Sequence, residues 1–187
     1  MLIEIIAPTY DRTLPLITLI SSLENQTDED WGLNIVVDGD CGVADSIAKL
    51  FGSSRVKVTY TGQRYNDWGH TPREMGKQAS EADYVVMTGD DCYYVPSFVS
   101  ELRKAAEDKP GMIYWDMVHS HYNYDFFRCS PGFNAIDMGA FATRSDLAKQ
   151  IKLNTSYAAD GEFVEEFKQR FPNEKIVKIN HVLFVHN

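Results

Sequence analysis

Short apolar runs alternate with amphipathic segments along most of this chain. The run at residues 3–7 (IEIIA) is followed by residues 15–26, where leucine and isoleucine recur at the spacing of one helical face. Further strands are expected at residues 33–38, 55–60, 84–88, 111–117, 175–179 and 181–185, and further helices at 43–51, 71–82, 98–107, 145–151 and 161–171. This alternation predicts an α/β fold with an open, mostly parallel, twisted sheet flanked by helices.

The length of 187 residues suits a single domain, expected to span residues 1–187, with a substantial core. No repeat, low-complexity tract or linker divides the sequence. Ser97 is expected to cap the helix at 98–107, since serine favours that position. Residues 118–135 are aromatic and irregular, and no element is assigned to them.

Charge and cysteine content narrow the classes of function. The net charge of −9, from 27 acidic and 18 basic side chains, disfavours unaided binding to a polyanion. Cys41, Cys92 and Cys129 are scattered and odd in number, so they do not predict a disulfide framework. No apolar stretch is long enough for a membrane span, and the N-terminus lacks the basic region of a secretory signal. A reducing cytoplasm is the expected location.

Polar residues gather where expected strands end. In open parallel sheets, ligands bind beyond the carboxyl ends of the strands. Thr9–Arg12, Asp38–Asp40 and Asp90–Asp91 follow three such strands, and Asp160 precedes a helix. Adjacent carboxylates raise each other's pKa, so Asp90 and Asp91 need compensation, and a divalent cation is one candidate. Taken alone, these aspartates also suit a solvated turn, and Asp160 also suits a helix N-cap.

The order of several blocks resembles a known family. They are IIAPTYDR, SLENQTDEDWGLNIVVDGD, a PRE-type helix before EADYVVMTGDDCYYVPSF, and IDMGAFATRSDL running on to AADGEFVEEF. Together they resemble glycosyltransferase family 2 of the GT-A superfamily over nearly the whole chain. The resemblance implies a Rossmann-like nucleotide-sugar fold. It also implies a metal-dependent, inverting transfer of a sugar from a nucleotide-diphosphate sugar, most often a UDP-sugar, to an acceptor hydroxyl.

The resemblance also implies roles for single residues. Asp160 would be the general base, and Asp91 would bind Mn²⁺ or Mg²⁺. The donor nucleotide sugar would contact Pro8, Thr9, Tyr10, Arg12, Asp38, Arg73 and Asp90, with Asp90 towards the ribose. Cys92 stands where the family's D-x-D motif has Asp or Asn, so the choice between Asp90 and Asp91 as metal ligand stays open. Because no covalent intermediate is needed, Cys92→Ala should keep much of the activity.

Other candidates surround the expected pocket. His186 ends the last strand and is a candidate metal ligand, with His181 as its competitor, since some GT-A enzymes place a C-terminal histidine on the metal. Trp68, His70, Trp115 and Asp137 are candidates for the pocket or the acceptor side, although Trp68 also suits a core anchor. His119 and His121 alternate as on one strand face, but no third ligand is apparent, so a metal pair is not expected there.

Three other functions remain open from the sequence. The chain could bind a nucleotide sugar without transferring it, act as a nucleotidyltransferase, or be a purely structural α/β domain. Nucleotidyltransferases usually carry a Gly-rich, basic segment after the first strand, where this chain has APTYDRTLP. The sequence also does not identify the sugar acceptor. It could be a small molecule or a group on a larger partner, and a homodimer partner could complete the site that binds it.

Overall fold

The computed structural model describes residues 1–40 and 42–187. Cys41, one of the three scattered cysteines, lies outside the described residues. The strands are β1 (Ile3–Thr9), β2 (Trp31–Val37), β3 (Val56–Tyr60), β4 (Tyr84–Met87), β5 (Tyr93–Tyr94), β6 (Met112–His119), β7 (Asp125–Phe127), β8 (Phe141–Arg144) and β9 (Ile176–His186). The α-helices are α1 (Thr13–Glu24), α2 (Val43–Phe51), α3 (His70–Ala79), α4 (Phe98–Ala105), α5 (Ser145–Ala148) and α6 (Ala159–Arg170). Short 3₁₀ turns lie at Ser120–Tyr122 and Met138–Ala140.

The described strands form one sheet in the order β3-β2-β1-β4-β8-β6-β9-β5, with β7 paired to β6. β3, β2, β1 and β4 are parallel, as the alternating pattern predicts. β8 is antiparallel to both β4 and β6, and β9 is parallel to β6. Therefore β6 and β9 run in the same direction as β4, and the carboxyl ends of β1, β2, β4, β6 and β9 face the same edge of the sheet.

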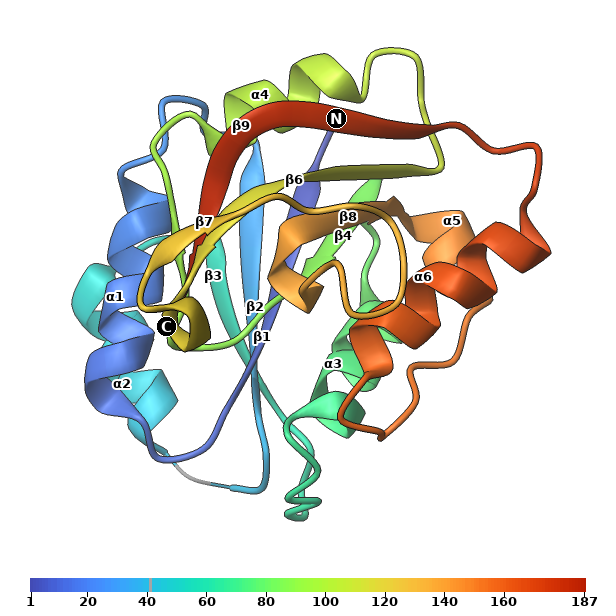
Figure 1. Ribbon diagram of the computed structural model, residues 1–187. Coiled ribbons are helices and arrows are strands. Elements are labelled where there is room, and N and C mark those ends of the chain that lie inside the picture. Colours follow the sequence, from blue (N-terminus) through green and yellow to red (C-terminus); the bar gives the residue numbers. More distant parts are fainter. Residues whose placement is uncertain (41) are drawn as a thin grey trace.

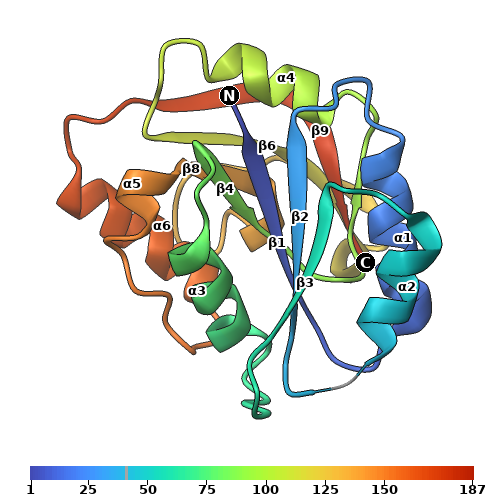
Figure 2. The same cartoon turned by 180° about the vertical axis from the view of Figure 1, so that it is seen from behind.

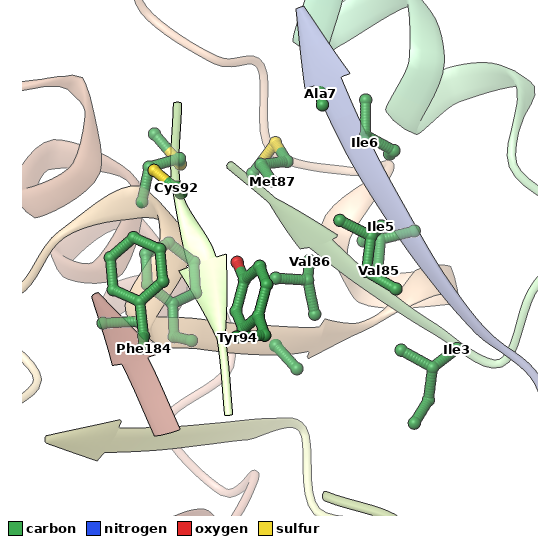
Figure 3. Packing of buried hydrophobic residues seen from close by; sticks show 14 of the residues in the cluster. Ile3, Ile5, Ile6, Ala7, Val85, Val86, Met87, Cys92, Tyr94 and Phe184 are labelled. Carbon is green, nitrogen blue, oxygen red and sulfur yellow. The ribbon is translucent and has the colours of Figure 1, made fainter. Parts of the chain in front are cut away.

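Helices cover both sides of the sheet. α1 and α2 pack together on one side, and α3 lies on the other side, with α5 and α6 near it (Figures 1 and 2). Every residue of β1 and β4 is buried, and both strands are apolar apart from Glu4, which pairs with Lys57, and Thr9. Figure 3 shows Ile5 of β1, Val86 of β4, and the rings of Tyr94 and Phe184 in this core. No helix in the described ranges is long and apolar enough to cross a membrane.

Several predicted boundaries were wrong. β1 continues through Pro8, because β4 pairs with β1 only as far as Ile6 and leaves the later residues one neighbouring strand. The two expected C-terminal strands are one strand, β9, with a register irregularity opposite Trp115 and Asp116. Ser97 stands at the N-cap of α4 but makes no capping hydrogen bond.

The sequence patterns gave no indication of β5, β7 and β8. β5 has two residues and β7 has three, too few to show an alternation. β8 is a four-residue strand between β4 and β6, with Phe141, Ala142 and Thr143 buried. Burial on both faces removes the polar alternation by which a short antiparallel strand is usually recognised.

Candidate active site

One edge of the sheet brings most of the predicted residues into one region. Thr9 ends β1, Asp38 follows β2, and Asp90 lies three residues after β4. His119 ends β6 and His186 ends β9, and these two histidines are register partners across the sheet. The parallel direction of these strands is therefore what assembles the site.

Asp90 and Asp91 form the first group of this edge. Arg12 donates from Nη1 to Asp90 Oδ1 at 2.9 Å and from Nη2 to Asp91 Oδ2 at 3.0 Å. Thr9 Oγ1 donates to Asp90 Oδ2 at 2.6 Å. Burial raises the pKa of Asp90, while Thr9 and Arg12 oppose that rise. The charge of the adjacent carboxylates is thus compensated by a guanidinium. The role of Asp91 as a metal ligand stays a prediction.

Asp38 is buried and holds a loop. Its Oδ1 accepts from the backbone N–H of Tyr65 at 2.7 Å, and its Oδ2 accepts from that of Asn66 at 2.9 Å. The neighbouring guanidinium of Arg64 lies 3.3 Å from the centroid of the Tyr10 ring. Sequence reasoning missed Arg64, which has no motif of its own. A contact of Asp38 with a base remains a prediction.

A cavity of about 430 Å³ lies at the ends of β6 and β9, where His119 and His186 line it. It is lined by six of the predicted residues: Trp68, His70, Arg73, Asp137, Asp160 and His186. The lining also includes residues from the segment that the sequence left unassigned, among them His121, Tyr122 and Phe127. The aromatic content of that segment is therefore explained in part by its position at the cavity.

The turn before α3 fixes Arg73 and Trp68. Arg73 donates from Nε to the Thr88 carbonyl at 2.9 Å and from Nη1 to the Trp68 carbonyl at 2.8 Å. Trp68 is 70% exposed and has a φ of 56°, an uncommon value for a large residue. Gly69 follows with a φ of 80°, and a Cβ there would lie 2.5 Å from Pro8 Cγ. These contacts hold a cation in the cavity and a tryptophan at its edge.

Asp160 lies in the first turn of α6. The helix begins at Ala159 and its N-cap is Ala158, so the prediction of Asp160 as the N-cap was wrong by two positions. Its Oδ1 accepts from the N–H of Gly161 at 2.6 Å. Burial raises the pKa of Asp160 to about 6, and the charge of Asp137 adds to that rise. A carboxylate with this pKa can accept a proton near neutral pH.

Three side chains form a second polar group in the same cavity: His119, Asp137 and His186. The rings of His119 and His186 are stacked with centroids 4.2 Å apart. Asp137 Oδ2 lies 3.8 Å from His186 Nε2. One ligand atom from each of the three residues lies within 4.8 Å of the others. Burial and the neighbouring His186 lower the pKa of His119, which favours its neutral form.

The sequence showed no third ligand beside His119 and His121, and the fold brings two potential ligands to His119. Its companions are Asp137 and His186, which are distant in the sequence and meet it through the register of β6 and β9 and the turn before β8. His121 lines the same cavity but is not among the three. The sequence suggested His119 and His121 as a pair on one strand face, but β6 ends at His119 and His121 lies in the 3₁₀ turn that follows.

Two predicted residues lie elsewhere. Trp115 is fully buried and packs edge-on against Phe98, because the face of β6 that carries it reaches the cavity only later, at Met117 and His119. His181 is exposed, and its Nδ1 lies 3.7 Å from Glu101 of α4. Trp115 is thus a core residue, and His181 does not compete with His186 in this arrangement.

A larger cavity, of about 910 Å³, lies at the opposite edge, near the start of β4. Its two arginines are already paired: Arg103 with Asp28 at 2.6 Å, and Arg144 with Glu174 at 2.9 Å. The chemistry-bearing groups lie in the smaller cavity. We therefore take the smaller cavity as the candidate active site.

Known structures share this fold. Residues 1–349 of TarS from S. aureus superpose with a TM-score of 0.82 at 15% identity, over 100% of this chain and 60% of that chain. The same protein in complex with UDP-GlcNAc gives 0.78 at 16%, over 99% and 58%. The mannosyltransferase PcManGT from Pyrobaculum calidifontis, in complex with GDP-Man and Mn²⁺, gives 0.75 at 14%, over 98% and 56%. At these identities the likeness concerns the fold, and it confirms the expected GT-A type sheet.

The sequence comparisons place the chain in a family. No curated protein matches the sequence closely enough to count as a relative. The family described as glycosyl transferase family 2 matches residues 4–161, which includes both polar groups except His186. The expected family and enzyme class are therefore confirmed: the chain belongs to glycosyl transferase family 2.

Proposed function

We propose that this domain transfers a sugar from a nucleotide-diphosphate sugar, with UDP as the first nucleotide to test, to an acceptor hydroxyl with inversion at the anomeric carbon. The observation that carries the proposal is that Asp160 and Arg73 line the same cavity. Asp160 has a pKa of about 6, and Arg73 is held by two carbonyls. A base near neutral pH and a fixed cation are the two aids that this reaction needs.

The donor side of the proposal rests on the carboxyl ends of β1, β2 and β4. Pro8, Thr9 and Tyr10 end or follow β1, and Asp38 follows β2 beside the stacked Tyr10 and Arg64. Arg12 joins Asp90 and Asp91 into a preformed group next to them. A nucleotide base and ribose would bind here. The solved relatives bind UDP-GlcNAc or GDP-Man, so both nucleotides are candidates.

The chemistry then follows from the two charged groups. Asp160 would remove the proton of the acceptor hydroxyl as that oxygen attacks, since a carboxylate is too weak a base to ionise a free alcohol beforehand. Arg73 would stabilise the charge that grows on the departing diphosphate. Attack from the side opposite the diphosphate gives inversion and requires no covalent intermediate.

A divalent cation, Mn²⁺ or Mg²⁺, would support the same step by neutralising the diphosphate. The cavity offers carboxylate and imidazole ligands for it, and PcManGT is described with Mn²⁺. We therefore keep metal dependence as part of the proposal.

The acceptor would enter where aromatic rings border the cavity. Trp68 is 70% exposed and Tyr157 is 81% exposed, and both line the cavity that holds Asp160. Exposed rings next to a base suit an acceptor with an apolar face, such as a sugar ring. The Trp68 backbone is held in its uncommon conformation by Arg73, which links the acceptor side to the leaving-group side.

The first test is release of nucleotide from UDP-, GDP-, dTDP- and ADP-sugars with Mn²⁺ and no acceptor. Slow hydrolysis of one donor, absent for the others, would support transfer and name the nucleotide. Binding of a nucleotide by calorimetry without any release or product would favour a binding protein that does not transfer. Absence of both would contradict the proposal.

A further inference from the structure

The two polar groups at the carboxyl edge differ in how their charge is balanced. Asp90 and Asp91 share Arg12, and Asp90 also accepts from Thr9. Within residues 1–40 and 42–187, the ion-pair partner of Asp137 is His186, at 3.8 Å. Arg12 already occupies one carboxylate oxygen of each aspartate in the first group, whereas the second group presents a carboxylate and two imidazoles that no Lys or Arg contacts at ion-pair distance within the described residues.

The hydrogen bonds of the second group leave ligand atoms available. Ser120 Oγ lies 3.3 Å from His186 Nδ1, so a proton on Nδ1 can be donated to the hydroxyl, with the lone pair of Nε2 turned towards Asp137. Asp137 Oδ1 accepts from the N–H of Gly139 at 2.8 Å, which leaves Oδ2 facing the histidine. His119 Nδ1 accepts from the N–H of His121 at 3.1 Å. If His119 binds a metal, the hydrogen bond from the N–H of His121 is lost and the bond to the metal replaces it.

The backbone supports this arrangement. His119 and His186 are paired residues at the ends of two neighbouring strands, and their stacked rings project into the same cavity. Asp137 sits at the N-cap of the turn Met138–Ala140. Gly139 in that turn has no room for a side chain, because a Cβ would contact the ring of Phe184. The three ligands thus come from ordered strand ends and a tightly packed turn.

We propose that His119, Asp137 and His186 bind a transition-metal cation such as Mn²⁺ in the absence of donor, and that Arg12 takes the place of a cation at Asp90–Asp91. Two imidazoles and one carboxylate favour Mn²⁺ and later first-row metals over Mg²⁺, which prefers oxygen ligands. Three protein ligands leave coordination positions open for a diphosphate. That use of the metal rests on the proposed function, whereas binding without donor does not.

The experiment is titration of the full chain with Mn²⁺ alone, followed by the electron paramagnetic resonance signal of free Mn²⁺. The wild type is expected to bind one Mn²⁺, and Mg²⁺ in excess is expected not to displace it. His186→Ala and Asp137→Asn should each weaken binding by about tenfold or more. Asp91→Asn should bind as the wild type does, because its carboxylate is already paired with Arg12.

Matched controls separate ligation from folding. His181→Ala removes an exposed histidine from the same strand and should leave Mn²⁺ binding unchanged. His186→Gln keeps the size of the side chain and should lose binding while the circular dichroism spectrum stays that of the wild type. Loss of binding in Asp91→Asn with binding kept in His186→Ala would overturn the proposal, as would no binding by the wild type. Mn²⁺ binding without any sugar release would keep this site and reject the proposed function.

Discussion

The two polar groups lie at the same carboxyl edge of the sheet but are built differently. Asp90 and Asp91 are adjacent in the sequence, and their compensating charge, Arg12, comes from the loop after β1. His119, Asp137 and His186 come from three separate segments and have no Lys or Arg within ion-pair distance among the described residues. On the assignment proposed above, the cation binds at the group whose members are distant in the sequence and not at the adjacent aspartates.

The largest expected effect concerns Mn²⁺ and stability. Since the ligands come from β6, β9 and the turn before β8, Mn²⁺ should bind the folded state and stabilise it. At a Mn²⁺ concentration about 100 times the Kd, the free energy of unfolding should rise by about 2.7 kcal/mol. Urea unfolding with and without Mn²⁺ measures this. The increase should vanish in His186→Gln and after chelation, and an equal increase in that variant would place the metal elsewhere.

The turn before α3, which holds Trp68 at the cavity, gives the next effect. Gly69→Ala would force a Cβ against Pro8 at a backbone φ of 80°, with a cost of about 1–3 kcal/mol in the free energy of unfolding. Gly52→Ala is the matched control, because Gly52 also has a positive φ of 62° but no neighbour near its Cβ. Chemical denaturation of both variants should show the greater loss in Gly69→Ala. Equal losses would mean that the contact with Pro8 contributes nothing.

Arg12→Gln tests the charge balance at the first group. The two carboxylates would then repel each other. We expect the free energy of unfolding to fall by about 1 kcal/mol at pH 7, a small change because Arg12 is partly exposed. The folded-state pKa of Asp90 is already raised by burial, and loss of Arg12 would raise it further. A carboxyl group with a raised folded pKa destabilises the fold above that pKa. The loss of stability should therefore shrink as the pH falls through the raised folded-state pKa of Asp90 towards its ordinary value, and a loss that is constant with pH would contradict this interpretation.

The smallest effect is expected for Cys92→Ala. Cys92 is buried and its thiol pKa is raised by burial, so no reactive thiolate is present at neutral pH. Donor hydrolysis should stay within about threefold of the wild type, since truncation of a small buried side chain costs modest stability and no chemistry. Complete loss of release in a folded variant would require a covalent or positioning role for the sulfur.

Features that depend on residues close together in the sequence could be predicted, whereas features that depend on segments far apart in the sequence could not. β1, β2 and β4 could be predicted because strands buried on both faces are rich in apolar residues, with few polar interruptions. Asp160 and Arg73 could be predicted from motif blocks of fixed order. His119 could not be joined to Asp137 and His186, because their meeting depends on the order of β8, β6 and β9 in the sheet. Trp115 was misplaced because a period of two shows which residues share a face but not where the core ends.

The central claim, sugar transfer with Asp160 as the base, is tested most directly by the pH dependence of donor hydrolysis. Asp160 must be ionised to accept a proton, so the rate for the wild type should rise as the pH passes through about 6 and then level off. Asp160→Asn should lose about 100-fold or more of the plateau rate together with that rising limb. A wild-type rate that is flat from about pH 5 to 8, or an Asp160→Asn variant as fast as the wild type, would contradict the account.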